Sequence, residues 1–180
     1  MTYLPREDSF LLQKCIKDYA HGRILDMGTG SGILAVEAAR FSDEVIAADI
    51  DSGAIKSCQE KIQKNGSPKI KFIVSDLFAK VYGKFDLIIF NPPYLPNHPD
   101  TKDIALDGGE KGYELAQRFL GQAVHYLTKD GKILLLISTL TNRKKIEATL
   151  IEKKCKFKII KEQKMDFESL FVYLIEKEAL

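Results

Sequence analysis

The sequence has 180 residues, 45% of them hydrophobic and 29% charged, so it is long enough for one sizeable core and too apolar for wholesale disorder. Its 27 Lys and Arg nearly balance its 25 Asp and Glu, and the net charge of +2 gives no overall reason to expect a nucleic-acid coat or a membrane surface as partner. No apolar run reaches the length of a membrane span, and charged residues at 6–8 interrupt the stretch where a secretory signal would be apolar. We therefore expect one domain over residues 1–180, located in the cytoplasm.

The cysteines and histidines argue against a disulfide framework and against a metal centre. Cys15, Cys58 and Cys155 are odd in number and far apart, and they form no CxxC pair, which fits a reducing cytosol. The three histidines are scattered, so we expect no zinc site built by this chain alone.

Helical and strand patterns alternate along the chain. A first helix is predicted to begin at 7–9, where acids fill its first turn; apolar residues from Leu12 to Tyr19 recur at helical spacing, and Gly22 is placed to end it. Further helices are predicted over 33–39, from 52 to the Asn65-Gly66 pair, around 116–123, and after a cap at Thr141 or Asn142. Strands are predicted over 23–27, 45–49, 70–74, 85–90, 132–138, 156–165 and 169–176, the last two as an antiparallel hairpin.

This alternation predicts an α/β fold. Strands with continuous apolar runs, separated by helices, form a mostly parallel sheet that helices cover on both faces. Such sheets bind ligands at the carboxyl ends of their strands, near the switch in strand order. Every unusual cluster of residues in this sequence follows the end of a predicted strand.

The first cluster is a glycine-rich turn between a strand and a helix. Asp26 is followed by Gly28, Gly30 and Gly32, a G-x-G-x-G spacing that differs from the dinucleotide pattern G-x-G-x-x-G. Glycines let the backbone approach a ligand closely. Because Asp26 would repel a pyrophosphate, the turn suits a ligand with positive charge. A generic tight turn is an equally good interpretation of the glycines alone.

Carboxylates follow the next two strands. Asp49 can accept hydrogen bonds from both ribose hydroxyls of a nucleoside, whereas Asp51 or Ser52 is placed to cap the following helix. Asp76 and the backbone of Leu77 are placed to hold an adenine edge, although Asp76 alone is as well explained as a turn residue.

The fourth cluster is the most informative. The strand 85–90 runs directly into Asn91-Pro92-Pro93-Tyr94. The two prolines remove two backbone donors, so the carbonyls of Asn91 and Pro92 tend to be left free of local pairing. These carbonyls and the Asn91 side chain can accept hydrogen bonds from a planar NH₂ group on which Tyr94 can stack. A proline-stiffened loop with a buried tyrosine is the alternative; after three nucleoside-type clusters, we favour the functional interpretation.

Taken together, these clusters resemble a class I S-adenosylmethionine (SAM)-dependent methyltransferase that modifies a planar nitrogen, with a Rossmann-like seven-stranded sheet. The resemblance implies SAM as methyl donor, S-adenosylhomocysteine as product, and catalytic roles for Asn91, Pro92 and Tyr94. It also implies that residues 5–10 fold over the cofactor, although favourable acid and cap placement at a helix start explains this segment equally well. The implied cofactor-binding residues are Pro5, Ser9, Asp26, Gly28, Gly30, Gly32, Asp49, Ile50, Asp76, Leu77 and Asn91.

Three further segments resemble the HemK-like N5-glutamine methyltransferases. Residues 3–12 match their Tyr-x-Pro-x-Glu-Asp-Ser/Thr-Phe-Leu-Leu segment, residues 106–112 match their Gly-Gly-x-x-Gly stretch, and residues 167–173 match the last strand of the short archaeal and eukaryotic branch. The bacterial branch carries an extra N-terminal helical domain with no counterpart here. The combination therefore points to the short branch. No single one of these motifs is unique to it.

Membership of the short branch implies a substrate and a partner. That branch methylates the glutamine of the Gly-Gly-Gln motif in class-1 peptide-chain release factors, and a small zinc-binding activator subunit supports it. With no separate recognition domain in 180 residues, we expect the loop 95–112 to choose the substrate. Asn91 and the Pro92 carbonyl would aim the amide nitrogen at the methyl group, and Tyr94 would cover the amide plane.

The implied strand order, 3-2-1-4-5-7-6, leaves Ile70–Val74 and 156–165 as the edges of the sheet. Alternating lysines at 154, 156 and 158 blunt the second edge, whereas the first has no such defence beyond its start. We hypothesise that the activator subunit pairs with Ile70–Val74 by β-augmentation; a loop that covers this edge is the alternative.

Two other functions remain open on the sequence. One is an RNA or DNA amino-methyltransferase acting on adenine N6 or guanine N2, which would be the only reason to expect a nucleic-acid partner. The other is a non-catalytic SAM-binding module that regulates a partner. Residues 143–164 contain nine Lys or Arg and three Glu, a stretch that could meet RNA or an acidic protein; we favour a solvated face.

Overall fold

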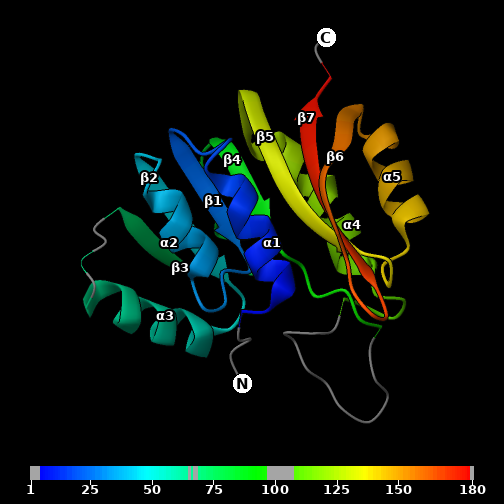
Figure 1. Ribbon diagram of the computed structural model, residues 1–180. Coiled ribbons are helices and arrows are strands. Elements are labelled where there is room, and N and C mark those ends of the chain that lie inside the picture. Colours follow the sequence, from blue (N-terminus) through cyan, green and yellow to red (C-terminus); the bar gives the residue numbers. More distant parts are fainter. Residues whose placement is uncertain (1–4, 65, 67–68, 97–107, 179–180) are drawn as a thin grey trace.

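The computed structural model describes residues 5–64, 66, 69–96 and 108–178 (Figure 1). Three sequence predictions fall partly outside these residues. They concern Tyr3 and Leu4 of the N-terminal segment, Asn65 at the expected end of a helix, and positions 97–107 of the loop expected to choose the substrate. The described base of that loop is closed by a hydrogen bond from the Gly108 amide to the Leu95 carbonyl.

Seven strands form one sheet in the order β3-β2-β1-β4-β5-β7-β6, as predicted. The first five strands pair in parallel, and β7 pairs antiparallel with both β5 and β6. The strands are β1 (Arg23–Met27), β2 (Glu44–Asp49), β3 (Ile70–Val74), β4 (Phe85–Phe90), β5 (Leu127–Ser138), β6 (Cys155–Lys164) and β7 (Ser169–Lys177).

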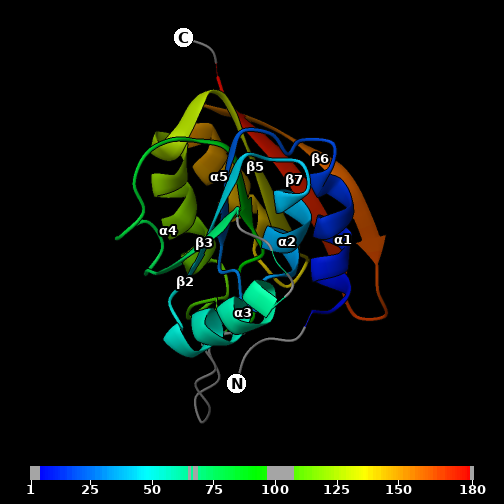
Figure 2. The ribbon, with the colours of Figure 1, turned by 90° about the vertical axis from the view of Figure 1, so that its left-hand side faces the viewer.

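Helices cover both faces of the sheet (Figure 2). On one face lie α1 (Glu7–Ile16), α2 (Ile33–Ala39) and α3 (Ser52–Lys64); on the other lie α4 (Glu114–Ala123), the 3-10 turn η1 (Val124–Tyr126) and α5 (Arg143–Glu152). No helix in the described ranges is long and apolar enough to cross a membrane.

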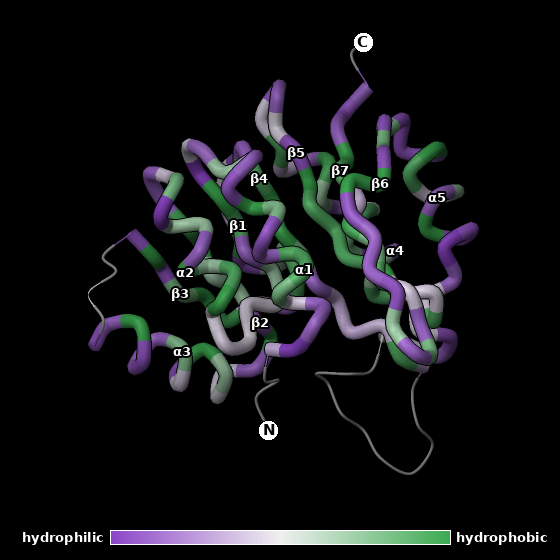
Figure 3. The backbone as a smooth tube through the Cα atoms, in the orientation of Figure 1, coloured by the Kyte–Doolittle hydropathy of each residue, from purple (hydrophilic) through white to green (hydrophobic). Residues whose placement is uncertain are grey.

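The central strands are apolar because both of their faces are buried. In β4, Leu87 and Ile89 pack into the core beneath α1 and α2, whereas Ile88 and Phe90 pack into the core beneath α4 and α5. Hydrophobic residues therefore follow one another along the strand without alternation. Figure 3 shows the same continuity as green segments along β1, β4 and β5.

Two predicted boundaries were wrong. Helix α1 ends at Ile16, not at Gly22. Gly22 has a φ of +57° and comes directly before β1, and its carbonyl accepts a hydrogen bond from the Asp43 amide. Strand β5 begins at Leu127, five residues before the predicted start at 132. The pairing of β5 with β4 shifts register here, because Leu127 lies opposite Phe85 and Lys132 lies opposite Leu87. Gly131 lies in this irregular part, where a Cβ atom would be only 2.7 Å from the Phe85 carbonyl oxygen.

Two predicted caps were confirmed. Asp51 precedes α3 and its side chain accepts from the Gly53 amide at 2.8 Å, so the cap belongs to Asp51 rather than Ser52. Asn142 precedes α5 and accepts from the Lys145 amide at 3.3 Å.

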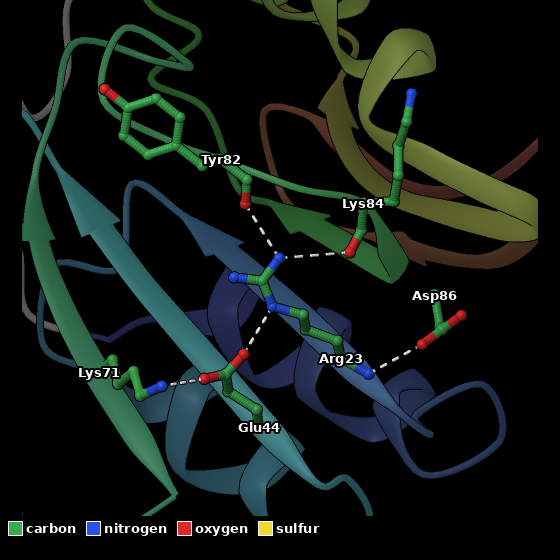
Figure 4. A network of polar contacts seen from close by, with 6 residues as sticks. All are labelled: Arg23, Glu44, Lys71, Tyr82, Lys84 and Asp86. Carbon is green, nitrogen blue, oxygen red and sulfur yellow. Dashed lines mark hydrogen bonds and ion pairs between the residues drawn. The ribbon is translucent and has the colours of Figure 1, made fainter.

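A polar network joins the starts of four strands at the end of the sheet away from the glycine-rich turn (Figure 4). Arg23 of β1 pairs with Glu44 of β2 at 2.6 Å, and Glu44 also pairs with Lys71 of β3. The backbone amide of Arg23 donates to the Asp86 carboxylate of β4 at 2.9 Å. The Arg23 guanidinium donates to the Tyr82 carbonyl, also at 2.9 Å.

Candidate active site

The glycine-rich turn forms a tight backbone cradle between β1 and α2. Gly28, Gly30 and Gly32 have φ of +63°, +50° and +81°, values that L-residues with side chains rarely adopt. A Cβ atom at Gly32 would lie 2.3 Å from the sulfur of Cys58 on α3. The backbone conformation therefore favours glycine at all three positions. Because these residues have no side chains, the turn can approach a ligand closely.

Asp49 organises this cradle from the end of β2. One of its carboxylate oxygens accepts from the Gly30 amide and the other from the Asp51 amide, each at 2.9 Å. These two bonds fix the carboxylate beside the glycine turn and leave it lone pairs for further donors. The next residue, Ile50, is 51% exposed, so an apolar side chain lies open beside Asp49.

Asp26 is completely buried under the same turn. One oxygen accepts from the Thr29 hydroxyl at 2.6 Å, and the other, Oδ1, has no hydrogen-bond partner among the described residues. Burial raises the pKa of Asp26 to about 7; the Thr29 hydroxyl and the Ala35 backbone oppose this shift, and the Asp49 charge adds to it. A cation bound beside Oδ1 would lower this pKa again. That the turn holds a positively charged ligand stays a prediction.

The turn after β3 is held in an unusual conformation. Leu77 has φ of +45°, a strained value for a branched side chain, and its carbonyl accepts from the Ser75 hydroxyl at 2.8 Å. Ser75 also accepts from the Lys80 amide at 3.0 Å. One guanidinium nitrogen of Arg118 on α4, Nη2, donates to both oxygens of the Asp76 carboxylate, each contact at 3.1 Å. Both side chains are half exposed, so the pair is accessible to a ligand.

Asn91 lies at the end of β4 and touches the start of α1. Its amide NH₂ donates to an oxygen of Asp8 at 3.1 Å and to the Ser9 hydroxyl at 3.3 Å. Because an ionised carboxylate only accepts, Asp8 orients the NH₂ group toward itself and the amide oxygen away from α1. That oxygen, Oδ1, is buried and has no partner among the described residues. It is therefore a fixed acceptor that lacks a donor.

The remaining predicted residues follow Asn91 in the chain or precede α1. Pro92 is buried, and Tyr94 is partly buried and packs against the core beneath α1. Burial raises the pKa of Tyr94 well above its usual range, and the Glu168 and Asp8 carboxylates raise it further. Pro5 is partly buried just before α1. In the residues that the structure describes, no group of three or more His, Cys, Asp and Glu could hold a metal ion.

Sequence reasoning missed several residues of this site. Nothing in the sequence pattern singled out Arg118 or Ser75. For Asp8, a favourable acidic residue at the start of a helix was as good an interpretation as a place over the cofactor. Its contact with Asn91 joins residues 83 positions apart in the chain. Asp8 lies within residues 3–12, the segment that resembles the HemK-like N5-glutamine methyltransferases. This resemblance was the one signal that could have identified Asp8 as a site residue.

Comparison with known proteins identifies the family of this chain. The model for the methyltransferase small domain matches residues 7–165. The chain belongs to this methyltransferase family. A protein of Methanocaldococcus jannaschii named "Putative protein N5-glutamine methyltransferase" is 38% identical over 177 residues, which covers 95% of this chain and 89% of that protein. The chain is thus a SAM-dependent methyltransferase related to N5-glutamine methyltransferases.

Two further similarities place this methyltransferase among its relatives. The release factor glutamine methyltransferase of Deinococcus radiodurans is 36% identical over 124 residues, but the match spans only 44% of that protein's length. The structure of the E. cuniculi Mtq2-Trm112 complex, described as responsible for methylation of the eRF1 translation termination factor, superposes with a TM-score of 0.80 at 25% identity. It covers 98% of this chain and 99% of the matched one. This agreement also confirms the Rossmann-like fold predicted from the sequence.

Proposed function

We propose that this methyltransferase transfers a methyl group from SAM to the side-chain amide nitrogen of the glutamine in the Gly-Gly-Gln motif of a class-1 peptide-chain release factor. The observation that carries the proposal is the buried Asn91 Oδ1, an oriented acceptor without a donor. A primary amide offers two N–H donors and a planar face, which this acceptor and the adjacent Tyr94 ring fit. The names of the relatives in M. jannaschii, D. radiodurans and E. cuniculi support the same substrate class.

The residues of the cradle fit the cofactor. Asp26 Oδ1 is a buried acceptor that lacks a donor and would take the cationic amino group, while Asp49 would accept from the ribose hydroxyls. Backbone of Gly28, Gly30 and Gly32 would line the methionine end, and Pro5 and Ser9 would close over it. Ile50 and Leu77 would contact the adenine, with Asp76 at its amino edge; this needs Asp76 to share or release Arg118. SAM bound there would supply a methyl group attached to a positively charged sulfur, which is a good leaving group.

The protein's part in the reaction is positioning. The Asn91 side chain and the Pro92 carbonyl would accept the two amide hydrogens, which turns the nitrogen lone pair toward the methyl carbon. The bound cofactor would supply the methyl group and leave as S-adenosylhomocysteine with the electron pair of the broken C–S bond. The substrate nitrogen, held by Asn91 and Pro92, would gain the methyl group and lose one proton to water. Tyr94 would cover the amide plane and exclude competing orientations. No strong base is needed, because sulfonium is already a good leaving group.

The substrate class can be tested with labelled cofactor. We expect the methyltransferase, incubated with methyl-tritiated SAM, to label a class-1 release factor and to leave RNA and DNA pools unlabelled. Label in RNA or DNA would instead support an amino-methyltransferase acting on adenine or guanine. An absence of label in all three pools, with SAM binding intact, would support a non-catalytic SAM-binding module.

We further propose that a small zinc-binding activator subunit pairs with β3. The strand is the edge of the sheet, and the E. cuniculi relative was solved as a complex with Trm112. The Val45 amide donates to Lys69 and the Ser75 amide donates to Asp49, so odd-numbered residues of this segment pair with β2. Because backbone groups alternate along a strand, the amides of residues 70, 72 and 74 point outward toward a partner.

This proposal predicts the effect of a proline at the outer edge. Val74→Pro removes an outward N–H donor without removing a bond to β2, so we expect it to abolish co-purification of the activator while SAM affinity persists. Val74→Thr, which keeps the donor, serves as the matched control and should co-purify normally. Full activity of the isolated wild-type chain with a release factor would contradict the need for a partner.

A further inference from the structure

The first turn of α1 is anchored beside the end of the strand that leads into Asn91. Leu12 of α1 is completely buried and belongs to the same core as Leu87 and Ile89 of β4. Asp8 lies in the first turn of this helix and is only 5% exposed. A favourable interaction with the helix dipole does not require an acid to be buried. The burial of Asp8 therefore calls for a role beyond the start of the helix.

Both oxygens of the Asp8 carboxylate accept hydrogen bonds. Oδ1 accepts from the backbone amide of Ser9 at 2.6 Å, and Oδ2 accepts from the NH₂ group of Asn91 at 3.1 Å. The Ser9 amide is one of the first amides of the helix, which have no acceptor within the helix, and as a backbone group it can only donate. It holds Oδ1, so that Oδ2 is the oxygen that faces Asn91.

The other neighbour of the Asn91 side chain leaves the direction of its amide open. The Ser9 hydroxyl oxygen accepts from Asn91 Nδ2 at 3.3 Å. A hydroxyl can donate as well as accept, so Ser9 could bind either end of the amide, whereas an ionised carboxylate binds only the NH₂ end. Asp8 therefore determines the orientation that leaves Asn91 Oδ1 buried without a partner among the described residues.

We infer that Asp8 is a positioning residue for methyl transfer, whose carboxylate fixes the orientation in which the Asn91 amide oxygen, and not its NH₂ group, faces the substrate. A reversed Asn91 would present donors to the N–H donors of the substrate amide. The inference rests on the proposed function for the role of Asn91 Oδ1, and it deepens that function by naming the group that sets the direction of this acceptor. The effect of Asp8 on the reaction passes through Asn91.

Two substitutions of Asp8 separate orientation from packing. In Asp8→Asn, the new amide oxygen should face the Ser9 amide, so the new NH₂ group should face Asn91 and reverse its side chain. With release factor as substrate, we expect kcat to fall on the order of a hundredfold. Asp8→Ala removes the carboxylate without favouring the reversed amide, so kcat should fall only about tenfold. A packing role predicts the opposite ranking, because alanine leaves a cavity and asparagine does not.

Exchanging the two side chains tests the same contact in reverse. In the double variant Asp8→Asn with Asn91→Asp, the amide at position 8 can donate to the carboxylate at position 91, whose second oxygen would face the substrate. We expect kcat to recover to within about tenfold of the wild type. The exchange conserves the net charge of the pair. Asp18→Asn, the same change at an exposed carboxylate after α1, should match the wild type.

Three results of these rate measurements would overturn the inference. The first is a wild-type rate in Asp8→Asn. The second is a folded Asp8→Ala enzyme that is slower than Asp8→Asn. The third is a folded exchange variant that is no faster than Asp8→Asn, because the acceptor at position 91 would then not depend on its partner at position 8.

Thermal unfolding provides a readout that needs no methyl acceptor. Asn91→Asp alone places two carboxylates in contact, so its Tm should lie below that of the wild type, and adding Asp8→Asn should raise the Tm again. Additive losses of Tm would also overturn the inference, since the two side chains would then not interact. Failure of the proposed substrate would appear differently, as a release factor that the wild-type enzyme leaves unmethylated while the two Tm effects persist.

Discussion

Replacing Asn91 by alanine should abolish methyl transfer and leave the affinity for SAM nearly intact. The side chain supplies the buried Oδ1 acceptor that would bind one amide hydrogen of the substrate, and Asp8 and Ser9 hold that acceptor in place. Removing a preorganised group that orients the reacting atom typically costs on the order of a hundredfold or more in kcat. Single-turnover transfer to a release factor measures the rate, and calorimetry measures SAM binding.

Asn142 provides a matched control for this change. It is an asparagine that caps α5 outside the candidate site, and Asn142→Ser keeps a capping side chain. We expect this variant to transfer methyl groups at the wild-type rate. An Asn91→Ala enzyme that remained active would exclude the amide-binding role of Asn91.

Replacing Asp49 by alanine should weaken SAM binding about tenfold to a hundredfold. The change would remove the acceptor proposed for the ribose hydroxyls, and it would also release the Gly30 and Asp51 amides that the carboxylate now holds. Both losses act on the cofactor cradle, so we expect the effect in the dissociation constant measured by calorimetry. Asp51→Ser, which preserves a cap for α3, should bind SAM normally. Unchanged affinity in Asp49→Ala would remove Asp49 from the ribose site.

The strands could be predicted closely because burial on both faces leaves a strong pattern in the sequence. The predicted bounds of β1, β3 and β4 match the observed ones. The start of β5 could not be predicted, because Asp130-Gly131 has the composition of a turn. These two residues lie where the pairing with β4 shifts register, and Leu127 before them still pairs with Phe85. The prediction that Gly22 ends α1 was wrong for a related reason. A glycine with positive φ can end a helix, but it can equally lie just before a strand.

The polar residues of the candidate site could be predicted where they lie at, or directly after, the carboxyl end of a strand. Asp26, Asp49 and Asn91 were found in this way, because the topology brings the carboxyl ends of parallel strands together. Their partners could not be predicted, because they come from distant parts of the chain. Asp8 reaches Asn91 across 83 positions, and Arg118 reaches Asp76 across 42.

The most direct measurement is the location of the transferred methyl group. After incubation of the chain with the proposed activator subunit, SAM and a class-1 release factor, the factor should be digested and its peptides sequenced by tandem mass spectrometry. We predict a single methyl group on the side-chain nitrogen of the glutamine in the Gly-Gly-Gln motif, absent from a reaction with Asn91→Ala. A methyl group on another residue of the factor, or recovery of the methyl group in nucleic acid, would contradict a glutamine methyltransferase.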